Sequence, residues 1–273
     1  WRNRVSHRDT IFFAHATGFQ GSMYRQFLKS FEKNFDVLFQ ENFGRNPDFP
    51  IVDNWANQAL EVVDFLKDKE TPVIGIGHSM GGILNLLAAS KKPDLFKLLI
   101  LLDSPVMMGA LGIFLRLSKL FGLVESMSPA KKSRKRKDRW RNRQEALDYF
   151  QKNSFFNKFS SECLRDYCEV GLKEESGDVV LSIPVKEECS LFNSTPHNLD
   201  LLGKDGLPPI IYCQANRRVV TSQTSINRFV RKFKAKKVLI EGGHKLIATA
   251  FVSKHLKDVY WFSSEKIIGE EGL

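Results

Sequence analysis

Short apolar runs alternate along this chain with longer stretches in which apolar residues recur every three or four positions. The first pattern is typical of buried strands and the second of amphipathic helices. We expect strands at residues 10–14, 36–40, 72–75, 96–102, 209–214 and 237–241. We expect helices at about residues 23–33, 52–69, 83–90, 221–234 and 245–262. This alternation predicts an α/β fold, a mostly parallel sheet with helices on both faces.

The alternation stops after Pro105 and resumes near residue 203. The interval is helical and polar by turns. We therefore divide the chain into a first part of the core (residues 1–105), a helical lid or cap insertion (106–202) and a second part of the core (203–273). Because core strands lie before and after it, the insertion is expected to leave the core at one edge of the sheet, where it can cover a site.

Composition narrows the class of protein. With 273 residues, 42% of them apolar, the chain can bury a sizeable core, which excludes disordered and collagen-like chains. Its four cysteines form no C-x-x-C pair, so we interpret them as reduced thiols. No stretch has the apolar length of a membrane span and no signal peptide is visible, although the chain opens at Trp1 without a Met. We expect a cytoplasmic monomer or homodimer.

The strongest chemical signal is a G-x-S-x-G pattern centred on Ser79, at residues 77–81. It lies between a predicted strand and a predicted helix, the context that this motif requires. Glycines beside the serine remove Cβ clashes in a tight turn, which leaves the hydroxyl clear of the backbone at the carboxyl edge of the sheet. The alternative is an ordinary glycine-rich turn.

Three motifs together resemble the α/β-hydrolase superfamily, in particular serine esterases and lipases with a helical lid. HATGF at residues 15–19 resembles the family's early loop, and GHSMGG at residues 77–82 resembles its nucleophile elbow. GGH at residues 242–244, after the last predicted strand, resembles the loop that bears the catalytic histidine. The resemblance covers essentially the whole chain.

The resemblance implies a role for each motif. Ser79 is the expected nucleophile and His244 the general base and then acid. The backbone N–H groups of Thr17 and Met80 are the expected oxyanion donors. In the same loops, substrate-binding positions are expected at His15, Phe19 and His78. Of the six histidines, only His244 ends a strand in a glycine-flanked loop, although a helix-capping histidine is the alternative.

The acid of the triad departs from the commonest pattern. Many relatives carry an Asp after the penultimate strand, where this chain has the neutral Asn216 and no carboxylate. Asp103 directly follows the strand at 96–102, and a minority of the superfamily places its acid there. We therefore expect Asp103 to be the third triad member. The alternative is an Asp that only caps a turn before Pro105.

A serine at position 79 separates this chain from dehalogenases and epoxide hydrolases of the same fold, which need a carboxylate there. A serine nucleophile is compatible with cleavage of an ester, a thioester, an amide or a carbon–carbon bond. No metal-ligand spacing and no phosphate-binding glycine motif is present, so we expect no metal and no cofactor.

Residues 111–124 carry the most apolar helical pattern of the insertion. Ile113, Leu117, Leu120 and Val124 fall on one helical face, with only Arg116 and Lys119 as charges. We expect this face to cover an apolar acyl pocket. A basic amphipathic helix that lies on a membrane surface is the alternative.

The net charge of +10 is concentrated in residues 131–143, from Lys131 to Arg143, which we call the basic segment. Nine Lys and Arg and one Asp lie here, so this segment alone contributes +8. With Trp140 as its only aromatic residue, it lacks the interleaved aromatics of a nucleic-acid platform, and specific nucleic-acid binding is not expected. It is either a solvated face or a site for an anionic surface or headgroup.

These observations predict a serine hydrolase that cleaves carboxylic esters with an apolar acyl group under the insertion. A thioester hydrolase with the same machinery is the nearest alternative. A hydrolase-like binding module, which uses the basic segment to hold an anionic partner, is an alternative from another class.

Overall fold

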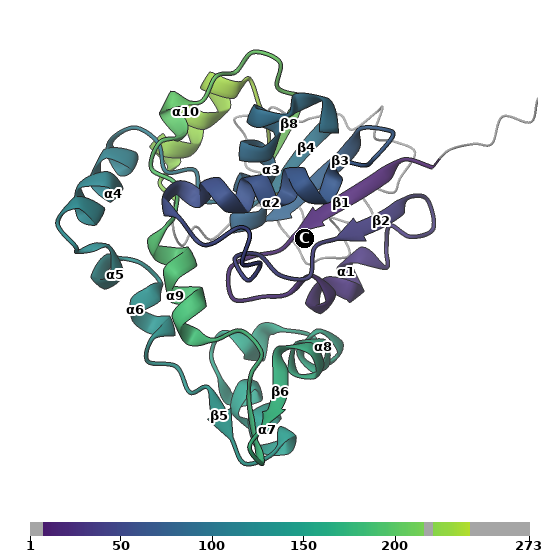
Figure 1. Cartoon of the computed structure of the whole chain (residues 1–273), viewed down its shortest axis with the longest axis vertical. Helices are drawn as coiled ribbons and strands as arrows, with labels where there is room; N and C mark the ends of the chain where they lie inside the picture. The colour runs from purple at the N-terminus through teal and green to yellow at the C-terminus, as the bar shows by residue number, and fades with distance from the viewer. Residues whose placement is uncertain (1–7, 216–220, 241–273) are drawn as a thin grey trace, which may run out of the picture.

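A six-stranded parallel sheet forms the centre of the molecule (Figure 1). The computed structural model describes residues 8–215 and 221–240. The strand order is β2-β1-β3-β4-β8-β9, and every pair is parallel. The strands are β1 (Thr10–Ala14), β2 (Asp36–Phe39), β3 (Val73–His78), β4 (Phe96–Leu102), β8 (Ile210–Ala215) and β9 (Lys236–Ile240). The predicted fold class and all six predicted strands are confirmed.

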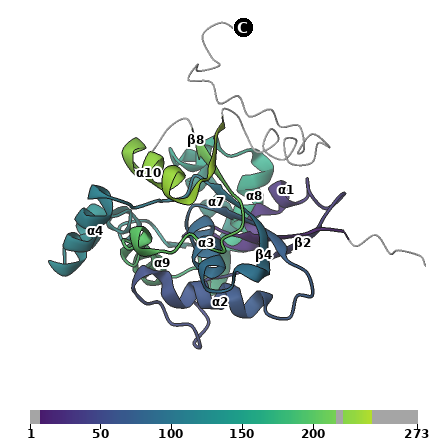
Figure 2. The same cartoon turned by 90° about the horizontal axis from the view of Figure 1, so that it is seen from above.

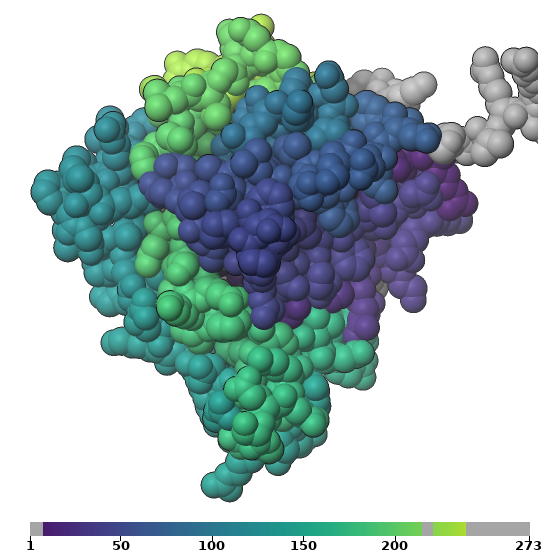
Figure 3. All heavy atoms as spheres, viewed as in Figure 1, coloured from purple at the N-terminus to yellow at the C-terminus, as the bar shows by residue number. Residues whose placement is uncertain are grey.

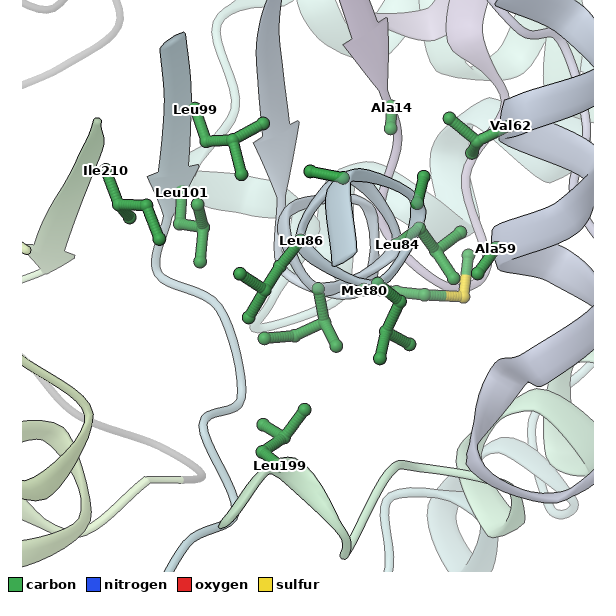
Figure 4. Packing of buried hydrophobic residues seen from close by; sticks show 14 of the residues in the cluster. Ala14, Ala59, Val62, Met80, Leu84, Leu86, Leu99, Leu101, Leu199 and Ile210 are labelled. Carbon is green, nitrogen blue, oxygen red and sulfur yellow. The ribbon is translucent and has the colours of Figure 1, made fainter. Parts of the chain in front are cut away.

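Helices cover both faces of this sheet because its strands are apolar on both faces. On one face, Phe12 and Leu101 belong to a core with α2 (Ala56–Leu66), α3 (Met80–Lys91) and α10 (Gln223–Phe233). Figure 4 shows α3 end-on within this core, between β4 and α2. On the other face, strand residues such as Phe13 pack with α1 (Arg25–Leu28), which lies across the sheet from α2 and α3 in Figure 2.

The expected helix at residues 23–33 is much shorter in the structure. A 3₁₀ turn (Gly21–Tyr24) leads into α1, and the chain then continues to Asn34 in turns with hydrogen bonds to the third residue back. Phe27, Leu28 and Phe31 are nevertheless buried against the sheet. Packing of these side chains therefore fixes the segment without a regular helix. The helix expected at 245–262 lies outside the described residues.

Residues between β4 and β8 form the insertion, which leaves the sheet at the carboxyl end of β4 (Figure 1). Its helices are α4 (Ala110–Leu120), α5 (Val124–Met127), α6 (Ala130–Ser133), α7 (Arg143–Lys152), α8 (Ser161–Gly171) and α9 (Val185–Asn193). Short 3₁₀ helices lie at Phe156–Lys158 and Leu199–Leu201 and, in the core, at Asp53–Trp55 and Pro93–Leu95.

The sequence pattern predicted a helical insertion, but the structure of the insertion also contains strands. An antiparallel sheet of β5 (Arg139–Trp140), β7 (Asp178–Leu181) and β6 (Leu172–Glu175) lies at its outer end. Strands β6 and β7 are joined by Ser176 and Gly177, which both have positive φ (55° and 86°), the geometry of a two-residue hairpin turn. The Ser-Gly dipeptide is the signal in the sequence that could have found this hairpin.

Of the four residues predicted to face a pocket, Val124 lines the apolar cavity, but the prediction is wrong for the other three. Ile113, Leu117 and Leu120 point to solvent, and α4 ends at Leu120, before Gly122 at φ 69°. Instead, α4 packs through small residues: Ser118 is buried, and a Cβ on Gly112 would lie 2.9 Å from the carbonyl oxygen of Met107. The periodic apolar face of this helix is the exposed one, so periodicity could not identify the side that packs.

The basic segment is largely ion-paired within the insertion. Arg136 binds the buried carboxylate of Glu188 on α9 at 2.7 Å, and Lys137 binds Glu145 at 2.8 Å. The remaining pairs are Arg134 with Glu125, Arg139 with Glu175 and Asp178, and Arg143 with Glu174. Five of the nine cations therefore have partners, and most of the segment's charge serves the insertion's own structure.

Trp55 joins the core to the insertion. Its side chain is fully buried at the start of α2, and its indole N–H donates to the carbonyl oxygen of Leu191 on α9 at 2.8 Å. Trp140 is equally buried, but its indole nitrogen has no hydrogen-bond partner among the described residues.

We therefore expect Trp55→Phe to lower the free energy of unfolding by about 1 kcal/mol more than Trp140→Phe, because only the first change leaves a carbonyl group without its donor. Urea denaturation of both variants measures the difference. Equal losses would mean that the Trp55 hydrogen bond contributes nothing to stability.

Candidate active site

Ser79 lies on the sharp turn between β3 and α3. Its backbone has φ 52° and ψ −116°, a conformation that L residues rarely adopt, and its N–H donates to the carbonyl oxygen of Leu102 at 2.8 Å. The side chain is half-buried and lines two cavities. The strained turn that G-x-S-x-G predicts is therefore present.

Three glycines make this turn possible because the elements meet with almost no space between them. A Cβ on Gly77 would lie 2.3 Å from the backbone of Gly81. A Cβ on Gly81 would lie 2.0 Å from the carbonyl oxygen of Ala14, at the end of β1. A Cβ on Gly82 would lie 2.1 Å from the hydroxyl oxygen of Ser104. The N-terminus of α3 is thus pressed against the ends of two neighbouring strands.

The early loop, residues 15–19, lies beside this turn. The N–H of Phe19 donates to the carbonyl oxygen of Ala16 at 3.2 Å, and Gly18 between them has φ 78°. The Thr17 hydroxyl lies 3.3 Å from the sulfur of Met80. The structure therefore places Thr17 next to Met80, the two residues whose backbone N–H groups are the predicted oxyanion donors.

Two cavities meet at Ser79 and Thr17. The first, of about 160 Å³, is mostly apolar and is bounded by α4, α5 and the segment after β4; its lining includes Trp55, Met107, Leu111, Phe114, Leu115 and Met127. The second, of about 210 Å³, contains Phe19, His78, Asp103, Phe155, Thr221 and Ile226. Each is smaller than the ~300–1,000 Å³ of a pocket for a drug-sized ligand. A molecule bound across Ser79 would therefore have two small parts, one on each side.

Asp103 shares the second cavity with Ser79. It directly follows β4, has φ 45°, and its N–H donates to the carbonyl oxygen of Cys213 on β8 at 2.8 Å. Asp103 is an exposed residue that lines this cavity. Asp103 and Ser79 therefore line one cavity, and the role of Asp103 as the acid of a triad stays a prediction.

His244 and Asn216, the expected base and the alternative partner for it, lie outside the described residues. The described strand β9 ends at Ile240, four residues before His244. Because β9 is parallel to β8 and next to it, the chain leaves β9 at the carboxyl edge of the sheet, the edge that bears Ser79.

The two loop histidines differ in what they contact. His78 lines the second cavity, and its Nδ1 lies 2.8 Å from the hydroxyl of Tyr24. His15 is only 2% exposed, donates from Nδ1 to the carbonyl oxygen of Ala16 at 2.9 Å, packs on the ring of Phe43, and is not among the lining residues of either cavity. Burial lowers the pKa of each histidine to about 4, so both imidazoles are neutral at pH 7.

Tyr24 is a site residue that the sequence did not reveal. Its hydroxyl oxygen accepts a hydrogen bond from the N–H of Ala16 at 3.4 Å. The hydroxyl proton is therefore free to be donated to Nδ1 of His78. Burial raises the pKa of this phenol, which keeps the donor protonated. Tyr24 therefore connects the early loop to the nucleophile turn, and no motif marks it. Phe192, which lines both cavities from α9, was missed for the same reason.

Two further features concern what the chain can hold or cross. Across residues 8–215 and 221–240, no cluster of three or more His, Cys, Asp or Glu side chains is arranged to bind a metal ion. In that same part of the chain, no helix combines the length and apolar character needed to span a membrane.

The chain belongs to the alpha/beta hydrolase family, whose family model matches residues 11–251. The fold and the strand–turn–helix around Ser79 agree with this membership. A search of curated protein sequences finds no match.

Solved structures share the fold at low sequence identity. A peroxisomal α/β-hydrolase from Saccharomyces cerevisiae is 17% identical, with a TM-score of 0.69 over 97% of this chain and 80% of its own. A thioesterase domain from the curacin biosynthetic pathway is 17% identical, with a TM-score of 0.66 over 89% of each chain. An esterase from a marine microorganism is 18% identical, with a TM-score of 0.61 over 92% of this chain and 95% of its own.

The low pKa of His15 has a consequence for stability. Between pH 6.5 and 4 the unfolded chain binds a proton at this imidazole that the folded chain does not, so stability falls as the pH is lowered through that window. His15→Gln keeps an N–H donor for Ala16 but removes the titration. We expect the free energy of unfolding of the wild type, relative to that of the variant, to fall by about 1–2 kcal/mol when the pH is lowered from 7.5 to 5.

Chemical denaturation at the two pH values measures both free energies. A separation that stays constant would show that the folded and unfolded states bind this proton equally.

Proposed function

We propose that this protein is a serine hydrolase that cleaves carboxylic esters through an acyl-enzyme on Ser79. The observation that carries the proposal is the serine itself. It is held in a strained turn at the junction of two cavities, and a carboxylate, Asp103, lies in one of them. A serine in such a turn is the nucleophile in hydrolases of this fold.

In the proposed mechanism, His244 takes the proton of Ser79 as the hydroxyl attacks the ester carbonyl, and then gives it to the leaving alcohol. Water then cleaves the acyl-enzyme with the same base. Asp103 orients the imidazole and stabilises its charged form. The N–H groups of Thr17 and Met80 bind the oxyanion, and removal of one such donor costs about 10²–10³ in rate.

The two cavities suggest how the substrate is oriented. The apolar cavity under α4 and α5 accepts the acyl group, because its walls offer chiefly aliphatic and aromatic contacts. The second cavity then receives the leaving group, where His78 and Thr221 offer polar contacts. Phe19 forms part of this second wall and packs edge-on against Tyr167.

Thioester hydrolysis is the second candidate, since the same nucleophile and oxyanion donors serve both bonds. One structural neighbour with this fold is a thioesterase domain. A binding module with an incomplete triad is the alternative outside enzymology. The pairing of five of the nine cations in the basic segment counts against an anionic partner held by that segment alone.

We also propose a reducing, cytoplasmic location. All four cysteines are free thiols in the structure, and three of them are buried. Buried unpaired thiols are compatible with a compartment in which disulfides do not form.

A fluorophosphonate probe tests the nucleophile. We expect it to label the wild-type protein on Ser79, and we expect Ser79→Ala to abolish both labelling and hydrolysis of p-nitrophenyl acyl esters. Peptide mapping by mass spectrometry identifies the labelled residue, and Ser90→Ala, on the same helix but away from the cavities, serves as the control. A protein that neither reacts with the probe nor turns over the esters belongs to the binding class.

A pair of variants tests the acid. Asp103→Asn should lower kcat by several hundredfold or more, because a neutral side chain does not stabilise the imidazolium, whereas Asn216→Ala should have little effect. Steady-state kinetics on one p-nitrophenyl ester compares the two, with thermal unfolding to confirm that both variants are folded. The reverse order of effects would remove Asp103 from the site.

A further inference from the structure

The outer side of α4 and α5 is unusually apolar. Seven of the twelve large apolar side chains that are exposed in the described part of the chain lie within residues 113–127. They are Ile113, Phe114, Leu117, Leu120, Phe121, Leu123 and Met127, which we call the apolar patch. In Figures 1 and 3, α4 and α5 lie along the left margin of the molecule and project from it. A concentration of this kind marks an interaction surface.

Apart from Phe114 and Met127, which also line the apolar cavity, the residues of the apolar patch are largely exposed. Leu120 and Phe121 are 75% and 69% exposed, while α4 contacts the body through Gly112, Leu115 and Ser118. Within the described residues, nothing covers Leu120 and Phe121.

Cations lie on α4 and on and after α6, which contacts α5. Arg116 on α4, and Lys131, Lys132 and Lys135 on and after α6, are exposed and have no ion-pair partner among residues 8–215 and 221–240. α6 turns its inner residues Ala130 and Ser133 toward α9, which places these lysines outward, next to α5.

The segment that carries the apolar patch has few acids of its own, and the acids that reach α4 from other elements, Asp53 and Asp200, are paired with Lys119 and Arg228. Residues 106–124 contain none, and Glu125, which follows them, is paired with Arg134. The surface is thus apolar with a positive rim. A second copy of the chain is a poor occupant, because a two-fold interface would bring the two positive rims together.

We propose that the outer side of α4, α5 and α6 docks on an anionic phospholipid membrane. The apolar patch enters the interface between headgroups and acyl chains, and the four unpaired cations contact lipid phosphates. Burial of the apolar patch and attraction of the cations to phosphate both favour binding through this surface. The ion-paired cations of the basic segment take no part.

Docking in this orientation has a consequence for the proposed function, although it does not depend on that function. Phe114 and Met127 belong to the apolar patch and also line the cavity that contains Ser79. The wall between membrane and acyl cavity is therefore a single layer of side chains. Lipophilic esters dissolved in the bilayer are the substrate class that this arrangement favours.

Flotation with lipid vesicles tests the proposal without any catalytic readout. We expect the full chain to bind vesicles of phosphatidylcholine with 30% phosphatidylglycerol, and to bind vesicles of phosphatidylcholine alone at least tenfold more weakly, as expected for several lysines at about fivefold each. Added salt should weaken binding to the anionic vesicles but not abolish it, because the apolar contribution is insensitive to screening.

Variants separate the two contributions. Leu120→Ser with Phe121→Ser should weaken binding at least tenfold by removing two large side chains from the interface. Lys131→Gln with Lys132→Gln should weaken binding to the anionic vesicles by about ten- to thirtyfold. Leu60→Ser is the matched control: Leu60 is 40% exposed on α2, outside the insertion, and its loss should leave binding unchanged.

Three results would overturn the proposal. They are no binding to anionic vesicles, binding unaffected by the Leu120 and Phe121 substitutions, or a dimer in sedimentation that those substitutions dissociate. Hydrolysis of a soluble ester by the Leu120→Ser, Phe121→Ser variant should equal that of wild type, because neither residue lines a cavity. Failure of docking is thereby distinguished from failure of the proposed activity.

Discussion

The close approach of the N-terminus of α3 to the ends of β1 and β4 is the constraint on which the rest of the site depends. Gly81 and Gly82 allow backbone and hydroxyl oxygens of neighbouring elements to lie where a Cβ would otherwise be. Ser79 adopts its rare conformation only because these contacts, and its hydrogen bond to Leu102, over-determine it. The same contact brings the early loop next to Met80. One packing arrangement therefore positions both walls of the candidate site.

The insertion is coupled to that arrangement through buried polar groups. The Glu188 carboxylate, paired with Arg136 and Ser133, lies where a Cβ on Gly18 would approach it to 2.9 Å. A buried ion pair of this kind contributes little net stability, but loss of one partner leaves an uncompensated charge. We interpret it as a contact that fixes α9 against the early loop, while Trp55 fixes the same helix one turn further on through Leu191. Sequence position gives no hint of either contact.

The sheet was predictable because each of its strands is a short apolar run between turn residues, and parallel pairing follows from the alternation with helices. The strained turn at Ser79 and the position of Asp103 in the same cavity were predictable because each residue directly follows a buried strand, while their catalytic roles stay predictions. The orientation of α4 was not, since its periodic apolar face is the exposed one, and its packing side is set by the small residues Gly112 and Ser118. Tyr24 was not predictable either, because its role arises from tertiary contacts with Ala16 and His78.

Ser225, near the start of α10, bonds the chain that leaves the site. Its hydroxyl accepts the N–H of Met108 at 2.8 Å and also contacts the carbonyl oxygen of Val106. Strand β4 likewise pairs with β8, more than a hundred residues further along the chain. During synthesis on the ribosome, the segment after Asp103 therefore lacks these hydrogen-bond and strand partners until β8 and α10 have emerged. The nucleophile turn can form before the insertion is made, but the walls around it are completed only after α10 has been synthesised.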